Sequence, residues 1–163
     1  MPCLLWDASA LVKRNAPEVG TEVVETLFEL PNVSMAITYS GYAEVCAVLR
    51  RKHNRDTIDK ATFQTARQAV EQEILLAPAV DLVTIDDADM LTGIGLTDKH
   101  HINSADAAIL SAFLRYIPQS PSTCLVVSAD QLLLRAAKVE GILTLNPETM
   151  ANSSLPLFPQ NLP

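Results

Sequence analysis

The sequence has no run of apolar residues approaching the roughly 20 that a membrane-spanning helix requires. No basic segment precedes its N-terminal apolar run, so we expect neither a membrane span nor a signal peptide. Cysteine is scarce, and Cys3, Cys46 and Cys124 form an odd, scattered set among apolar neighbours. This pattern argues against a disulfide framework or a zinc site and favours reduced thiols in a cytoplasmic protein.

Basic residues are also few, with 12 Lys and Arg against 19 Asp and Glu, which gives a net charge of −7. Since binding to nucleic acid depends on neutralising phosphates, the overall charge argues against such a partner. The total does not exclude a local basic patch, however. Carboxylates gathered to bind a metal ion would lower the net charge in the same way.

With 163 residues, 48% of them hydrophobic, the chain is long enough for one domain with a substantial core. Short apolar runs alternate with helical patterns, which predicts an α/β fold with a doubly wound sheet and helices on both faces. The expected strands are Cys3–Trp6, Ser34–Thr38, Val80–Thr84, Cys124–Ser128 and Ile142–Leu145. The expected helices are Gly41–Lys52, Asp56–Leu76, Ile85–Leu96, Ala105–Tyr116 and Ala129–Val139. We expect the domain to span residues 1–147 and a Pro-rich, extended tail to span residues 148–163.

Four acidic residues follow strands or connecting loops at predicted helix starts: Asp7, Glu44, Asp106 and Asp130. The C-terminal ends of parallel strands meet at one edge of a sheet, where ligands bind. Carboxylates gathered there repel one another unless a cation neutralises them, and we see no lysine or arginine placed to pair with any of the four. Oxygen ligands of this kind suit Mg²⁺ or Mn²⁺.

Helix capping is the alternative explanation for each acid taken alone. Acidic residues in a first turn complement the helix dipole, and Asn103-x-x-Asp106 has the spacing of a capping box. Capping also accounts for the cluster Asp86-Asp87-Asp89 without any ligand. The metal hypothesis therefore depends on the four acids lying together.

The four acidic segments resemble, in order and approximate spacing, the motifs of the PIN-domain family. The segments are Asp7-Ala8-Ser9-Ala10-Leu11, Tyr42-Ala43-Glu44-Val45, Ser104-Ala105-Asp106-Ala107 and Ser128-Ala129-Asp130-Gln131. The likeness covers residues 1–147. It implies a three-layer α/β/α PIN-like fold with a central, mainly parallel five-stranded sheet.

The compact size resembles VapC-type toxins of bacterial toxin–antitoxin systems. This likeness implies a Mg²⁺- or Mn²⁺-dependent endoribonuclease, often a homodimer, that a small antitoxin protein blocks. By the family pattern Asp7, Glu44 and Asp106 would hold the metal directly. Asp130 would hold a second ion or a metal-bound water. Ser9 and Ser128 match polar positions that support these acids.

Four basic residues are candidates to contact an RNA backbone beside the acids. Arg51 and Arg55 follow Glu44 by seven and eleven residues, which places them on its helical face if the helix persists. Lys13 and Arg14 follow Asp7. A solvated basic helix end is an equally good explanation of Arg51 and Arg55.

Other functions on a similar sheet fit less well. A haloacid-dehalogenase-like phosphatase requires a second aspartate where Ser9 stands, and a response-regulator receiver requires a lysine after a late strand. A non-catalytic PIN-like scaffold that binds RNA or a partner stays open. The pair His100-His101 precedes Asp106, in what we expect to be a loop, but the PIN motifs require no histidine.

Overall fold

The structure, a computed structural model, describes residues 2–150, so most of the predicted tail 148–163 lies outside the described residues. Strands and helices alternate along the chain. The strands are β1 (Cys3–Trp6), β2 (Ser34–Thr38), β3 (Val80–Val83), β4 (Cys124–Val127) and β5 (Leu143–Leu145). The helices are α1 (Ala8–Leu11), α2 (Thr21–Phe28), α3 (Tyr39–Asn54), α4 (Lys60–Val70), α5 (Asp87–His100), α6 (Ser104–Tyr116) and α7 (Gln131–Val139). Short helical segments are η1 (Val12–Arg14), η2 (Glu71–Leu75) and η3 (Ile117–Gln119).

The five strands form one parallel sheet in the order β3-β2-β1-β4-β5. The central strand β1 pairs with β2 and β4, so Trp6 at its end lies level with Ile37 and Val127. From β1 the chain continues outward to β2 and then β3, whereas from β4 it continues outward to β5 on the other side of the sheet. The topological switch point of the sheet, where ligands bind in open α/β folds, therefore lies at the C-terminal ends of β1 and β4.

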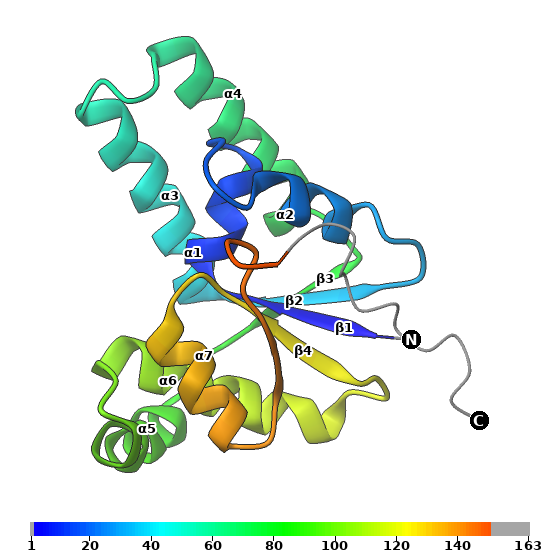
Figure 1. Ribbon diagram of the computed structural model, residues 1–163, viewed down its shortest axis with the longest axis vertical. Helices are drawn as coiled ribbons and strands as arrows, with labels where there is room; N and C mark the ends of the chain where they lie inside the picture. The colour runs from blue at the N-terminus through cyan, green and yellow to red at the C-terminus, as the bar shows by residue number, and fades with distance from the viewer. Residues whose placement is uncertain (1, 151–163) are drawn as a thin grey trace.

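Side chains of each strand alternate between two hydrophobic cores. Leu4 and Trp6 of β1 pack with residues of α1 to α4, whereas Cys3 and Leu5 pack with residues of α5, α6 and α7. Figure 1 shows the two groups of helices on opposite faces of the sheet. Burial on both faces explains why the inner strands β1, β2 and β4 read as continuous apolar runs. The helices on both faces of the sheet confirm the three-layer α/β/α fold.

Most predicted elements are confirmed, with small shifts at their ends. All five strands lie within one residue of their expected bounds. The helix expected from Asp56 begins at Lys60 instead, because Asp56 adopts a φ of 54° and the Asp59 side chain accepts a 2.7 Å hydrogen bond from the Thr62 N–H. Beyond Val70 this helix continues as the π-helical segment η2.

The expected helices did not include α1, η1 or α2, although Asp7 was predicted to start a helix and does cap α1. Helix α2 has only eight residues and begins at Thr21, after the N-cap Gly20, which has a φ of +91° and provides no capping side chain. A Cβ at Gly20 would lie 2.8 Å from the backbone carbonyl of Pro147, so a larger residue is excluded by contact as well as by conformation. The usual sequence signal for a helix start is therefore absent there.

Within residues 2–150 no helix is both long and apolar enough to cross a bilayer. Cys3, Cys46 and Cys124 are all free thiols. Cys3 and Cys124 are buried in the core between the sheet and α5 to α7.

Candidate functional site

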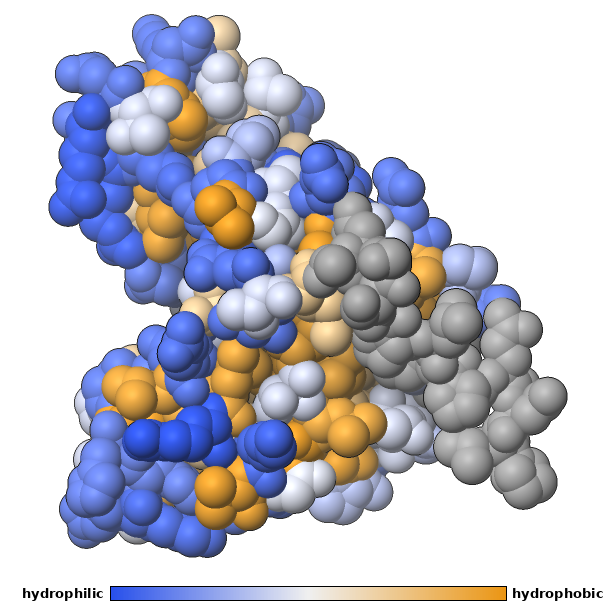
Figure 2. Space-filling view, viewed as in Figure 1, coloured by the Kyte–Doolittle hydropathy of each residue, from blue (hydrophilic) through white to orange (hydrophobic). Residues whose placement is uncertain are grey.

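The four predicted acids line one cleft at the C-terminal edge of the sheet. Asp7 directly follows β1, and Asp130 follows the neighbouring β4. Glu44 lies near the start of α3, and Asp106 is the third residue of α6. All four belong to the lining of a cleft of about 720 Å³. Figure 2 shows the surface hollowed on the left-hand side of the view, where the strands end, between the upper and lower layers of helices.

Asp7 is held by two serines that come from different ends of the chain. Its Oδ2 accepts hydrogen bonds from the Ser9 N–H (3.2 Å), the Ser9 hydroxyl and the Ser128 hydroxyl (2.9 Å). Ser9 Oγ and Ser128 Oγ are 3.1 Å apart, and Ser9 Oγ also accepts a 2.9 Å bond from the Ala129 N–H. These bonds join α1 to the end of β4 and orient the Asp7 carboxylate, which is only 7% exposed.

Asp130 and Asp106 are each fixed by hydrogen bonds at a helix start. One oxygen of Asp130, Oδ1, caps α7 by accepting from the Leu132 and Leu133 N–H groups at 2.7 and 3.0 Å. Oδ2 of Asp106 accepts a 2.6 Å bond from the Asn103 side-chain amide, whose oxygen accepts from the Asp106 N–H at 2.9 Å. Capping is therefore confirmed for Asp130, whereas at α6 the cap is Asn103, and the Asp106 carboxylate bonds to the side chain of Asn103 instead of a backbone N–H. Each bond set involves one carboxylate oxygen.

The second oxygen of each aspartate has no hydrogen bond to residues 2–150: Oδ1 of Asp7, Oδ1 of Asp106 and Oδ2 of Asp130. Each carboxylate is thus anchored by one oxygen and retains the other as a possible ligand. This division is what a cation site needs, since hydrogen-bonded carboxylates hold their ligand oxygens in a fixed orientation. Capping and metal binding are compatible here.

Burial, together with negative charge in the cleft, raises the pKa of Asp106 to about 6. Burial is the largest cause, followed by repulsion from Asp130 and then from Asp7, while the bond from Asn103 opposes the shift. The shift indicates that Asp7 and Asp130 lie close enough to Asp106 to destabilise its charge. A cation among them would remove that repulsion.

Glu44 differs from the other three acids, and one of our expectations about it is wrong. We expected no basic residue to pair with any of the four, but Arg51 Nη2 lies 2.6 Å from Glu44 Oε1. The two positions share a helix face seven residues apart, as the spacing predicts. Within residues 2–150 no three Asp, Glu, His or Cys side chains stand close enough to form a complete metal site. The ligand types fit Mg²⁺ or Mn²⁺, but the set requires side-chain movement to close.

The predicted RNA contacts divide into two pairs. Arg51 is 51% exposed near the cleft, and Arg55 is an exposed residue at the end of α3. Lys13 and Arg14 do not have the expected free surface positions. Lys13 is 2% exposed and pairs with Glu18 and Glu148, and Arg14 pairs with Glu73 while its guanidinium lies 4.2 Å from the centre of the Phe28 ring. The charges of Lys13 and Arg14 are thus neutralised by ion pairs within the domain.

We expect Lys13→Ala to lower the free energy of unfolding by about 1–3 kcal/mol, because it removes the ion pair of Glu148, one of the two ion pairs of Glu18, and a buried aliphatic stem. Urea denaturation measures this loss. The control is Lys138→Ala, which removes an exposed lysine of α7. RNA affinity should fall no more in Lys13→Ala than in this control; a larger fall would restore Lys13 as an RNA contact.

We expect both His100 and His101 in the loop before α6, and this is correct for His101 but wrong for His100. His100 ends α5 and is buried, with its Nε2 2.5 Å from Glu140 Oε1, and His101 is the left-handed residue that terminates the helix. Neither lines the cleft. Capping is confirmed for the cluster Asp86-Asp87-Asp89, since Asp86 and Asp89 form a capping box at the start of α5, and buried Asp89 also pairs with Arg115 at 2.6 Å.

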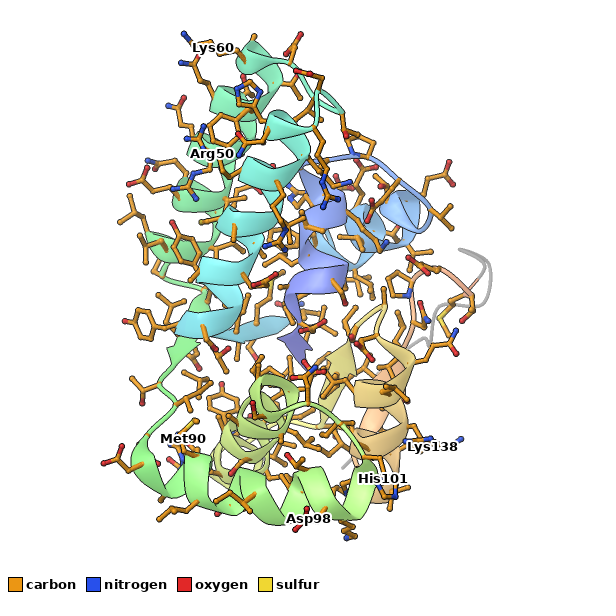
Figure 3. The ribbon with its side chains drawn as sticks, turned by 90° about the vertical axis from the view of Figure 1, so that its left-hand side faces the viewer. Arg50, Lys60, Met90, Asp98, His101 and Lys138 are labelled. Carbon is orange, nitrogen blue, oxygen red and sulfur yellow. The ribbon has the colours of Figure 1, made fainter. Side chains whose placement is uncertain are left out.

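Several cleft residues were not predicted as site residues. Asn103 orients Asp106, and its capping-box spacing was the available signal. The apolar wall of the cleft consists of Val48, Ile85, Met90 and Ile109, from elements above and below the sheet edge. In Figure 3, which faces this edge, α3 rises toward Arg50 and α5 crosses below it from Met90. No short motif predicts such a wall, because it forms only when the layers come together.

Ser128→Ala tests the support of the acids. Ser128 is buried, donates to Asp7 and accepts a 2.9 Å bond from the Asp130 N–H. Its loss should lower the free energy of unfolding by about 1–3 kcal/mol and any cleavage activity about 10–100-fold. Ser122→Ala, in the loop before β4, is the control and should change stability by no more than about 0.5 kcal/mol. Equal effects of the two substitutions would remove Ser128 from the site.

Comparisons with known proteins bear on the fold. No protein-family model matches the chain, and no curated protein matches its sequence. Three solved structures that resemble it are FitAcB from Neisseria gonorrhoeae, the sarcin-ricin loop cleaving toxin VapC20 from Mycobacterium tuberculosis and a toxin–antitoxin complex from Klebsiella pneumoniae.

The TM-scores of these three, in the same order, are 0.62, 0.61 and 0.58, at 17%, 13% and 15% sequence identity. The matches cover 90%, 86% and 88% of this chain and 99%, 96% and 97% of the other chains. At this identity a structural likeness shows the fold. The chain therefore shares its three-layer α/β/α, PIN-like fold with these structures, as the resemblance to the PIN-domain family implies.

Proposed function

We propose that this protein is a Mg²⁺- or Mn²⁺-dependent endoribonuclease and the toxin of a type II toxin–antitoxin pair. The observation that carries the proposal is the arrangement of Asp7, Asp106 and Asp130 in one cleft. Each is anchored by one oxygen with the other left free, and the pKa of Asp106 is raised to about 6 by burial and by the other two. Such a cluster is costly without a cation.

In the proposed site Asp7, Glu44 and Asp106 hold the metal ion, and Asp130 holds a second ion or a water. A bound divalent ion would orient the scissile phosphate, stabilise charge that develops on it and lower the pKa of an attacking water. Ser9 and Ser128 keep Asp7 in place, and Asn103 does the same for Asp106. Arg51 and Arg55 lie where they could contact phosphates on the α3 side.

The partners in the proposal are an RNA substrate, a small antitoxin and a second copy of the chain in a homodimer. One similar structure is described as a sarcin-ricin loop cleaving toxin and another as a toxin–antitoxin complex. The apolar wall of the cleft gives a protein segment a surface to cover beside the acids. Co-expression with the product of a neighbouring gene tests this part: a stable complex that suppresses cleavage is expected.

Cleavage of labelled single-stranded RNA by the purified protein tests the catalytic part. We expect cleavage with Mn²⁺ or Mg²⁺, no cleavage with EDTA, and none for Asp7→Asn. Mn²⁺ binding without cleavage of any RNA tested would argue for a different substrate, and absence of both would favour a non-catalytic scaffold. Cleavage that persists in EDTA would contradict metal dependence.

A further inference from the structure

The ion pair between Glu44 and Arg51 involves the one predicted metal ligand that is not an aspartate. Arg51 Nη2 lies 2.6 Å from Glu44 Oε1, and the two side chains are 51% and 53% exposed. Within residues 2–150 neither side chain has another hydrogen bond or ion pair. In the described part of the chain, the Glu44 carboxylate of the cleft and the Arg51 guanidinium are therefore each other's only side-chain partners.

Helix geometry explains how Arg51 reaches Glu44. Positions 44, 48 and 51 lie on one face of α3, and Val48 between them also lines the cleft. Helical side chains point toward the N-terminus of their helix, so that of Arg51 extends back along this face toward the sheet edge. The charge of Arg51 is thereby brought from the fourth turn of α3 to Glu44 at the cleft.

Two neighbouring basic residues of α3, Arg50 and Lys52, contact partners outside the cleft. The guanidinium of Arg50 lies 4.2 Å from the centre of the Phe63 ring, and Lys52 pairs with Glu18 at 2.8 Å. Arg55 has no ion pair within residues 2–150. Among these four, Arg51 is the one whose described partner is an acid of the cleft.

We propose that Arg51 is a positioning residue that occupies Glu44 while the cleft holds no cation, and that a divalent cation must displace it to recruit Glu44. This inference rests on the proposed metal site. A guanidinium beside Glu44 neutralises the charge that would attract the ion, and it also repels the ion directly. Arg51 therefore weakens cation binding in the absence of substrate and becomes available when the cation takes Glu44.

Displacement should require little free energy, since exposed ion pairs are weak and are screened by salt. The expected effect of Arg51 on cation affinity is accordingly about twofold to fivefold at low ionic strength. The effect should shrink as salt is added. Binding of the cation releases Arg51. An anion that binds the released Arg51 should therefore raise the affinity for the cation by the same factor by which the cation raises the affinity for the anion.

A Mn²⁺ titration of the full chain without RNA, followed by electron paramagnetic resonance at low salt and pH 7.5, tests the inference. The variants are Arg51→Ala and the matched control Arg55→Ala, which removes the same charge from the end of the same helix. Arg51→Ala should bind Mn²⁺ about two to five times more tightly than Arg55→Ala. Circular dichroism melting checks that both variants are folded.

Equal Mn²⁺ affinities in the two variants, or weaker binding by Arg51→Ala, would overturn the role of Arg51 and leave the proposed function in place. Failure of wild type and both variants to bind Mn²⁺ would overturn the metal site and this inference together. A difference that persists unchanged at high salt would also contradict an ion-pair mechanism.

Discussion

Asp106→Asn is expected to reduce RNA cleavage at least about 100-fold, because it removes a proposed metal ligand and one unit of negative charge. Asparagine keeps the shape of the side chain and can still accept the bond from Asn103, so the fold should be retained. The same substitution should abolish or greatly weaken Mn²⁺ binding. Cleavage of labelled RNA and a Mn²⁺ titration measure the two losses.

The stability of Asp106→Asn should change in the opposite direction from its activity. The folded-state pKa of Asp106 is raised to about 6, so the native state is favoured at pH values below the unfolded pKa and loses stability as pH rises through 6. At pH 7 without metal the substitution should therefore raise the free energy of unfolding. We expect a gain on the order of 1 kcal/mol, because one pKa unit corresponds to about 1.4 kcal/mol and solvent screens part of the repulsion.

The matched control is Asp98→Asn on α5, an exposed aspartate that does not line the cleft. It should leave cleavage, Mn²⁺ binding and stability unchanged. A fall in stability for Asp106→Asn, with cleavage preserved, would mean that Asp106 is a structural cap only.

Divalent cation should stabilise the folded protein, and the stabilisation should disappear in acid. At a free Mn²⁺ concentration 100 times Kd, linkage gives about 2.7 kcal/mol, which corresponds to a rise in Tm of about 5–10 °C for a chain of this length. As pH falls through about 6, Asp106 takes up a proton, and this proton competes with the ion for the carboxylate. Melting curves with Mn²⁺ and with EDTA should therefore converge below that pH.

Melting of Asp106→Asn under the same conditions is the control, and its Tm should respond little to Mn²⁺ at any pH. A Mn²⁺-induced rise in Tm that is the same at pH 5 and pH 8 would place the ion away from these aspartates. So would an undiminished rise in Asp106→Asn.

The sequence predicts the placement of Asp7 and Asp130 at the sheet edge, because the strands before them, β1 and β4, are clear apolar runs. A parallel sheet then brings the residues after neighbouring strands to one edge. Ser9 and Ser128 follow from the same motifs, and their hydrogen bonds to Asp7 are present in the structure. Local pattern and topology are sufficient for this half of the cleft.

The basic residues show where sequence information ends. Arg51 was correctly placed on the face of Glu44, but spacing does not determine whether its side chain turns to the carboxylate or to solvent. Lys13 was expected on the surface, yet it is buried by contacts that include Glu148, 135 positions away. Such long-range pairing depends on the tertiary fold, and a lysine carries no local sign of it.

The most direct measurement of the central claim is an anomalous difference map from a crystal of the protein grown with Mn²⁺. A metal site formed by the cleft acids predicts an anomalous peak within bonding distance of Asp7 and Asp106, with Glu44 turned from Arg51 toward the ion. The same crystals of Asp106→Asn should lack the peak. An empty cleft in the wild-type protein at saturating Mn²⁺, or an ion bound elsewhere with all four acids unliganded, would contradict the proposed site.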